Sequence, residues 1–164
     1  PISEAIREVI LNKDFTEMGY MTELLLYASA RAQLVKENIK PALDAGQAVI
    51  ADRFVDSSAV YQGIGRGLGV DTVYDVNEFA LQGIMPDMTF LMDLDAQEGI
   101  ARKKNQAELD RMENEKMEFH QKVVDGYRML ADMHPERIVK IDATLPIDEI
   151  HGIIVGYVEK KLNL

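Results

Sequence analysis

An aspartate and an arginine stand side by side at the end of a short apolar run. Residues 48–51 read A-V-I-A after Gly46, and Asp52 and Arg53 follow at once. A run of this length bounded by glycine is typical of a strand covered on both faces. Open α/β sheets bind ligands at the carboxyl ends of such strands. The acid could face a metal ion while the arginine grips a phosphate with its planar fork. For the pair alone, a salt bridge at a strand end is the favoured interpretation.

A set of polar side chains follows this pair along the chain. Ser58, Tyr61 and Gln62 are spaced i, i+3 and i+4, so a helix at this point places all three on one face. A hydroxyl, a phenol and an amide together suit the polar edge of a base or a sugar.

Tyr27 and Arg31 form a second pair, one helical turn apart. Residues 22–39 carry a broad apolar stripe that predicts a helix. On it, the tyrosine ring could stack on a base while the guanidinium hydrogen-bonds the base's carbonyl group. In the plainer interpretation, which spacing alone favours, Tyr27 is part of the core and Arg31 is a solvated charge.

The predicted elements alternate between helices and strands. A short helix through Leu11, capped by Ser3, comes before the helix over 22–39. Further helices are expected from Asp71 to Leu81, from Asp95 onward, over 111–133 and from Pro146 to Lys160. The predicted strands are residues 48–51, 88–94 and 137–142. Strands separated by helices predict an α/β fold with a parallel sheet and right-handed crossovers.

Composition bounds the class of protein. A chain of 164 residues suits one domain. The net charge of −10 argues against a nucleic-acid-binding surface, which needs a basic footprint. The sequence has no cysteine, no signal peptide and no apolar run of membrane length. We therefore expect a cytoplasmic protein without a membrane partner.

The ordered motifs resemble those of bacterial thymidylate kinases. The most characteristic stretch reads A-D-R-F-V-D-S-S-A-V-Y-Q-G, at residues 51–63. The resemblance extends in order over nearly the whole chain. It includes residues 22–33, 39–43, 85–94, 108–113 and 141–143, together with Phe119 and Tyr127. It implies a P-loop-type nucleoside monophosphate kinase fold, with a parallel sheet flanked by helices.

The resemblance also implies roles for the deoxythymidine monophosphate (dTMP) site. Tyr27 would stack on thymine, Arg31 would bond a thymine carbonyl, and Arg53 would hold the nucleotide's phosphate. Ser58 and Gln62 match positions that line the base pocket. Tyr61 matches the ring under the deoxyribose.

Further residues are implied for ATP and magnesium. Asp52 would lie near Mg²⁺, in contact directly or through water, and would act in catalysis with Arg53. A lid over about residues 102–113 would close over ATP and bring Arg102, Lys104 and Arg111 to it, the first two as catalytic groups. The family also implies a homodimer.

The sequence departs from the family pattern in two places. It contains no phosphate loop of the form G-x-x-x-x-G-K-[ST], so the resemblance implies that a first β-α-β unit is missing from this sequence. In the lid, the series Arg102, Lys104, Gln106 places a lysine and a glutamine where relatives often have arginines. Which lid residue stabilises the transition state therefore stays open.

The function expected from this resemblance is transfer of the γ-phosphoryl of MgATP to dTMP, giving dTDP and ADP. One alternative is a non-catalytic nucleotide-binding remnant that has lost its phosphate loop. Another is a different deoxynucleotide or deoxynucleoside kinase of similar fold. The 164 residues alone are expected to be inactive, because they hold no cradle for the β- and γ-phosphates.

Overall fold

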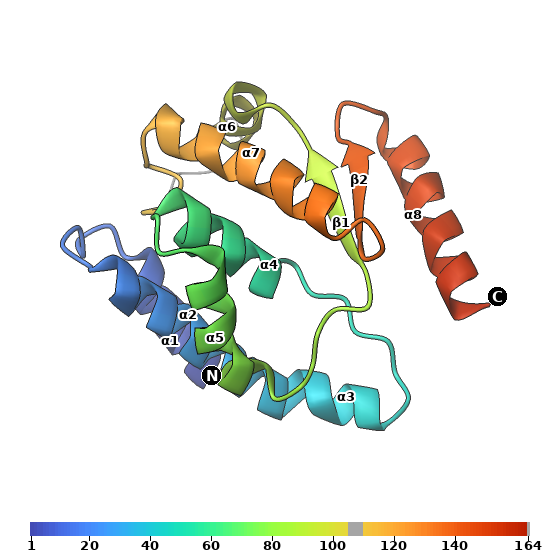
Figure 1. The fold of residues 1–164 in the computed structure, drawn as a ribbon, viewed down its shortest axis with the longest axis horizontal. Helices are drawn as coiled ribbons and strands as arrows, with labels where there is room; N and C mark the ends of the chain where they lie inside the picture. Colours follow the sequence, from blue (N-terminus) through green and yellow to red (C-terminus); the bar gives the residue numbers. More distant parts are fainter. Residues whose placement is uncertain (105–109, 164) are drawn as a thin grey trace.

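The computed structural model describes residues 1–104 and 110–163, and the side chains of Lys103 and Lys104 are outside this description. Its first half is helical (Figure 1). The elements there are α1 (Ile2–Leu11), α2 (Tyr20–Leu34), the π-helical η1 (Val35–Ile39), α3 (Lys40–Asp44), α4 (Val55–Ser58), the π-helical η2 (Ala59–Gly65) and α5 (Val70–Leu81). The second half holds β1 (Thr89–Asp93), α6 (Ala96–Lys104), α7 (Met117–Met133), β2 (Ile138–Asp142) and α8 (Ile147–Leu162).

The two strands form a parallel pair. Their register runs from Thr89 opposite Ile138 to Asp93 opposite Asp142, and α6 and α7 make the crossover between them (Figure 1). Phe90 meets Tyr157 of α8 edge-on, with the ring centroids 6.2 Å apart. The next residue, Leu91, packs against the core. Successive strand residues thus point to opposite faces, and the predicted parallel α/β arrangement is confirmed.

The core lies where α2, η2, α5 and α7 meet beside the strands. Its fully buried members include Leu24, Val60, Val73 and Leu130, each 0% exposed. Gly126 of α7 allows close approach at this point, because a Cβ there would lie 2.9 Å from Ile64 Cδ1. The packing therefore holds the segment after Arg53 firmly against α2 and α7.

The strand predicted over residues 48–51 is wrong. Residues 47–51 belong to no helix or strand, and Ile50 is 99% exposed. Among the described residues, β1 pairs with β2 alone, so the apolar run has no ladder partner. An apolar sequence favours burial, but a strand also needs a neighbour for its N–H and C=O groups.

Helix boundaries differ from the prediction in smaller ways. Ser3 does not cap α1; its hydroxyl donates instead to the Ala30 carbonyl at 3.2 Å. The helix predicted over 111–133 begins only at Met117, after a turn. The helical course of α2 continues through Pro41 to Asp44, beyond the predicted end. The π-helical turn η1 just before Pro41 accommodates a residue that has no N–H for an ordinary helical bond.

No helix in the described ranges is both long and apolar enough to cross a membrane.

Candidate functional site

Arg53 occupies an unusual backbone conformation. Its φ of 68° lies in the left-handed region, which a residue with a side chain adopts only at a cost in energy. The side chain is exposed and its guanidinium carbon lies 4.4 Å from the centre of the Tyr61 ring. Its Nε donates weakly to Ser57 Oγ at 3.4 Å. The backbone thus aims a cation over an aromatic ring at the start of α4, a geometry suited to an anionic ligand.

Ser57 connects this arginine to α7. The Ser57 and Tyr127 hydroxyls are 2.7 Å apart, and the Tyr127 ring meets Tyr61 edge-on at 6.3 Å. Burial raises the pKa of the Tyr127 phenol, so this group stays protonated and can donate. Ser57 was not among the predicted site residues, because nothing in the spacing distinguishes it from Ser58.

Arg31 is a buried cation with neutral partners. It is 8% exposed, so the alternative of a solvated surface charge is wrong. Its guanidinium donates to Ser58 Oγ at 2.8 Å, to the Phe54 carbonyl at 3.2 Å and to the side-chain carbonyl of Asn77. No carboxylate within the described ranges pairs with it. Burial lowers the pKa of Arg31 to about 10. The group remains charged at neutral pH, and no ion pair in the part of the chain that the structure describes balances its charge.

Asn77 is a partner that the sequence did not reveal. It is 0% exposed, and its amide nitrogen donates to the Val73 carbonyl at 2.8 Å. This bond turns the amide oxygen toward Arg31. An asparagine among the apolar positions of a helix was the only available signal.

The predicted base-pocket residues come from two neighbouring helical segments. Tyr27 is half-buried on α2, one turn before Arg31. Ser58 ends α4, while Tyr61 and Gln62 lie on η2. Ser58 and Gln62 are buried, at 2% and 1% exposed, and both contact side chains of α2. The structure therefore brings these predicted residues together. Wide π-helical turns of this kind occur often at functional sites.

Gln62 reaches a buried group of charges that we call the Glu23 cluster, consisting of Glu23, Gln62, Arg66, Arg111 and Glu115. Glu23 is 0% exposed and lies one turn before Tyr27. Its Oε1 accepts from Gln62 Nε2 at 2.8 Å, and its Oε2 accepts from Arg111 at 2.6 Å. Arg66 donates to both oxygens, at 3.2 and 3.1 Å. Glu23 and Arg66 are not among the predicted site residues, because partners 43 residues apart in the chain leave no local pattern.

The predicted lid residues fall in separate places. Arg102 lies on α6, where it donates to Glu98 at 2.5 Å and to the Ala143 carbonyl at 3.0 Å. Arg111 belongs to the Glu23 cluster and also donates to the Ile10 carbonyl at 2.7 Å. The side chains of Lys104 and Gln106 are outside the described residues. The roles of Arg102, Lys104 and Arg111 toward ATP stay predictions, as does the extent of the lid.

Asp52 is exposed and directly precedes Arg53. In the described ranges, no three histidine, aspartate or glutamate side chains are grouped to hold a metal ion. A dedicated cage is not required for Mg²⁺, which is often bound through one or two carboxylates, water and substrate phosphates. One exposed carboxylate beside an exposed arginine fits that mode of binding.

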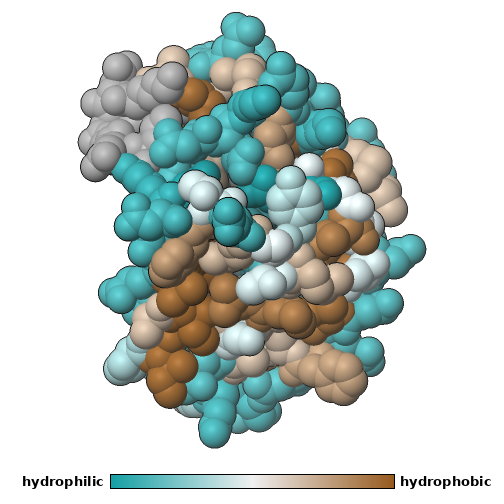
Figure 2. Space-filling model, turned by 90° about the vertical axis from the view of Figure 1, so that its left-hand side faces the viewer, coloured by the Kyte–Doolittle hydropathy of each residue, from teal (hydrophilic) through white to brown (hydrophobic). Residues whose placement is uncertain are grey.

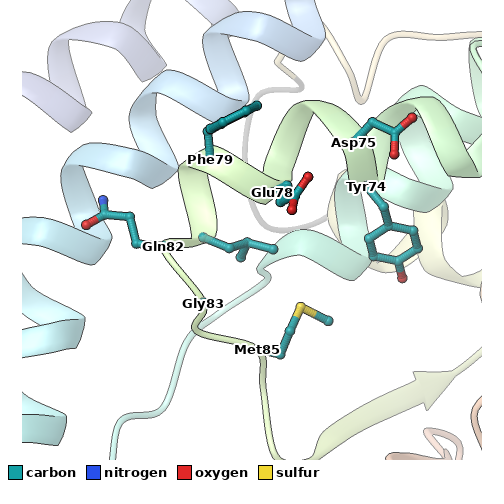
Figure 3. A pocket seen from close by; sticks show the side chains of 8 residues that line it. Tyr74, Asp75, Glu78, Phe79, Gln82, Gly83 and Met85 are labelled. Carbon is teal, nitrogen blue, oxygen red and sulfur yellow. The ribbon is translucent and has the colours of Figure 1, made fainter.

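Two hollows lie apart from these residues. One, of about 510 Å³, is at the carboxyl ends of β1 and β2 and is lined in part by Asp93, Asp142 and Thr144. This edge is where open α/β sheets bind ligands. The other, of about 690 Å³, lies between α5 and the stretch from Gly83 to Met85 (Figure 3). None of the predicted site residues lines the second hollow, so we assign it no part in the site.

The family comparison agrees with this arrangement. The family model described as thymidylate kinase matches residues 1–154. A thymidylate kinase of Geobacillus thermodenitrificans is 50% identical over 164 residues, which cover 99% of this chain and 73% of that relative. Thymidylate kinases of Clostridium novyi and Halalkalibacterium halodurans are 45% and 43% identical, and the matches cover 78% and 79% of their lengths. The chain belongs to the thymidylate kinase family.

Proposed function

We propose that the protein transfers the γ-phosphoryl group of MgATP to dTMP, giving dTDP and ADP. The observation that carries this proposal is the buried guanidinium of Arg31. A buried charge without an ion pair is costly, and Arg31 has only neutral acceptors among the described residues. A polar ligand atom that accepts a hydrogen bond there would offset part of that cost.

The base would lie against α2. Tyr27 supplies a ring for stacking, and Arg31 supplies a donor for a thymine carbonyl. Ser58 holds the Arg31 guanidinium, and Gln62 and Tyr61 complete the walls. The thymine methyl group can contribute only about 1–3 kcal/mol to selectivity. Selection of thymine over cytosine must therefore come from hydrogen bonds.

The phosphate of dTMP would bind Arg53. An exposed guanidinium held by Tyr61 and Ser57 can neutralise the acceptor phosphate so that it approaches ATP. An oxygen of this phosphate would then attack the γ-phosphorus of ATP, and the bond between that phosphorus and the β-γ bridging oxygen would break, so that ADP leaves with the bridging oxygen. Such transfers depend on positioning and on charge neutralisation more than on covalent chemistry from the protein.

Arg102, Lys104 and Arg111 are the candidates for contacts with ATP, with Arg102 and Lys104 in catalysis. Asp52 is the candidate ligand for magnesium, directly or through water. When bound, the ion would neutralise phosphate charge and orient the transferring group. Arg102 already lies at the end of β2, through its bond to the Ala143 carbonyl. Closure of a lid over about residues 102–113 would exclude water from the transfer.

A homodimer is supported by one face of the molecule. The side formed by α1, α2 and α5 carries a contiguous apolar area (Figure 2). Exposed apolar side chains on α1 and α2 include Ile2, Val9, Tyr20, Met21 and Leu25. Large contiguous apolar areas are typical of protein–protein interaction surfaces. Sedimentation equilibrium would test whether the protein is a dimer. The cytoplasmic location stays a separate prediction.

The activity is tested by offering the protein, as its gene encodes it, four acceptors with MgATP. We expect dTDP from dTMP, with slower transfer to dUMP and to dCMP and none to thymidine. Preferred phosphorylation of thymidine or dCMP would favour another kinase of similar fold. Nucleotide binding without any phosphoryl transfer would favour the non-catalytic alternative.

A further inference from the structure

Two hydrogen-bonded contacts join α2 to the segment made of α4 and η2. Glu23 meets Gln62, and eight residues further along α2, Arg31 meets Ser58. The two segments are therefore antiparallel at this point. Tyr27 lies midway between Glu23 and Arg31 on α2. The proposed stacking ring is bracketed by a carboxylate–amide contact on one side and a guanidinium–hydroxyl contact on the other.

The carboxylate of Glu23 is ionised and can only accept hydrogen bonds. Burial raises the pKa of this group, but the hydrogen bonds from Arg66, Gln62 and Arg111 outweigh burial and hold the pKa below its ordinary value. A carboxylate in this state has no proton to donate. The Gln62 side chain must therefore turn its NH₂ group toward Glu23, and its carbonyl oxygen must face away.

That oxygen is left available to a ligand. No described residue donates to Gln62 Oε1, although Gln62 is only 1% exposed. Within the described ranges, every fully buried side-chain nitrogen or oxygen atom has a hydrogen-bond partner. Because Gln62 Oε1 has none, this atom is not fully buried, and it must account for part of the small exposed area of the side chain.

We propose that Glu23 is a positioning residue that makes Gln62 present an acceptor to the base, and so selects thymine over cytosine. The inference rests on the proposed function, because it needs the base to lie beside Tyr27. Thymine carries a hydrogen on N3 and can donate to an acceptor. Cytosine carries a lone pair on N3, so it would meet the Gln62 oxygen with two acceptors facing each other.

The Glu23→Gln variant reverses this polarity. Arg111 and Arg66 both donate to Oε2 of Glu23, so they would retain the carbonyl oxygen of a glutamine there, while the 3.2 Å bond from Arg66 Nε to Oε1 would be lost. Its NH₂ group would then face Gln62, which must rotate to accept and so turn its own NH₂ toward the base. We expect dTMP to bind about tenfold more weakly and dCMP to bind more tightly. If Glu23 had a purely structural role, the substitution would weaken the binding of both nucleotides by the same factor.

The test measures affinities for dTMP and dCMP by calorimetry, on the protein as its gene encodes it. Glu115→Gln is the matched control, because it removes the other carboxylate partner of Arg66 and leaves Gln62 untouched. It should lower the melting temperature and keep the dTMP-to-dCMP ratio. In a Gln62→Met background, Glu23→Gln should no longer change the ratio, since the amide through which it acts is gone.

If Glu23→Gln does not fold, Glu23→Asp takes its place, since it keeps the charge near both arginines while withdrawing the acceptor from Gln62. The ratio should fall in this variant too. An unchanged ratio in a folded Glu23 variant would overturn the positioning role and leave the proposed function standing. Failure of the unsubstituted protein to prefer dTMP over dCMP would overturn the proposed function, and this inference with it.

Discussion

The guanidinium of Arg31 donates to the side-chain carbonyl of Asn77, and both side chains are buried. Asn77 also donates to the Val73 carbonyl, so its amide cannot rotate without losing a bond. A helix interior thus fixes the direction of a cation that belongs to the proposed base pocket.

Asn77→Ala should therefore affect both stability and recognition. Loss of a buried partner costs about 1–3 kcal/mol, and Arg31 would lose one of its fixed contacts. We expect a lower free energy of unfolding in urea and a smaller preference for dTMP over dCMP. An unfolding free energy that falls while the preference stays the same would restrict Asn77 to a structural role.

Arg53→Ala should weaken the binding of dTMP far more than the binding of thymidine, because only dTMP carries the phosphate. A hydrogen bond to a charged group contributes roughly 1.5–3 kcal/mol, or about one to two decades in affinity. Arg53→Lys should restore only part of the loss, since the planar fork is absent. Titration of both ligands into each variant measures the difference. Equal losses for dTMP and thymidine would remove Arg53 from the phosphate role.

Tyr27→Ala should weaken the binding of all pyrimidine nucleotides in similar proportion, because stacking on the ring face does not depend on the groups at the ring edge. Tyr27 is half-buried rather than part of the closed core, so we expect only a small fall in melting temperature. Affinities for dTMP, dUMP and dCMP provide the comparison. A large fall in melting temperature with unchanged affinities would support the alternative in which Tyr27 is only core packing.

Protonation of Glu23 should make the free energy of unfolding fall at acidic pH. The pKa of its carboxyl lies below the ordinary value of 4.5 when the protein is folded, so the unfolded chain takes up the proton first. The resulting stabilisation is fully present above about pH 4.5 and is lost as the pH falls through the lowered value. Urea unfolding between pH 3 and pH 7 should show a smaller decline in acid for Glu23→Gln than for the unsubstituted protein. Parallel curves would contradict this.

The sequence predicted those features that depend on local pattern. The strands around Thr89–Asp93 and Ile138–Asp142 and the helix ending at Leu81 were confirmed nearly to the residue, because apolar runs and turn residues bound them. The strand prediction for residues 48–51 was wrong, because apolar side chains do not show whether a neighbouring strand is present to pair with. The Glu23 cluster could not be predicted from the sequence either. Arg111 and Glu23 are 88 residues apart, and a charged residue in a helix looks the same whether it is solvated or buried.

The resemblance predicted the candidate pocket residues, and the structure shows which side chains contact them. Arg31, Ser58 and Gln62 were named in advance as candidates, whereas Asn77, Glu23 and Ser57 were not. These supporting residues have ordinary types at ordinary spacings. Only the packing of α2 against η2 and α5 makes them neighbours of the pocket.

The absence of a phosphate loop from the printed sequence leads to a separate expectation. A protein made of these 164 residues alone should not form dTDP from dTMP and MgATP, because no G-x-x-x-x-G-K-[ST] stretch is present to hold the β- and γ-phosphates. Chromatographic assay of dTDP checks this. Formation of dTDP by a monodisperse preparation of this chain would contradict it.

The most direct test of the account is the ratio of dTMP to dCMP affinity in Arg31→Ala, measured by calorimetry together with the melting temperature. Thymine presents a carbonyl group where cytosine presents an amino group, so the account predicts that removal of the Arg31 donor narrows the ratio by about tenfold. A well-folded Arg31→Ala protein with an unchanged ratio would contradict the central claim that this buried cation reads the base.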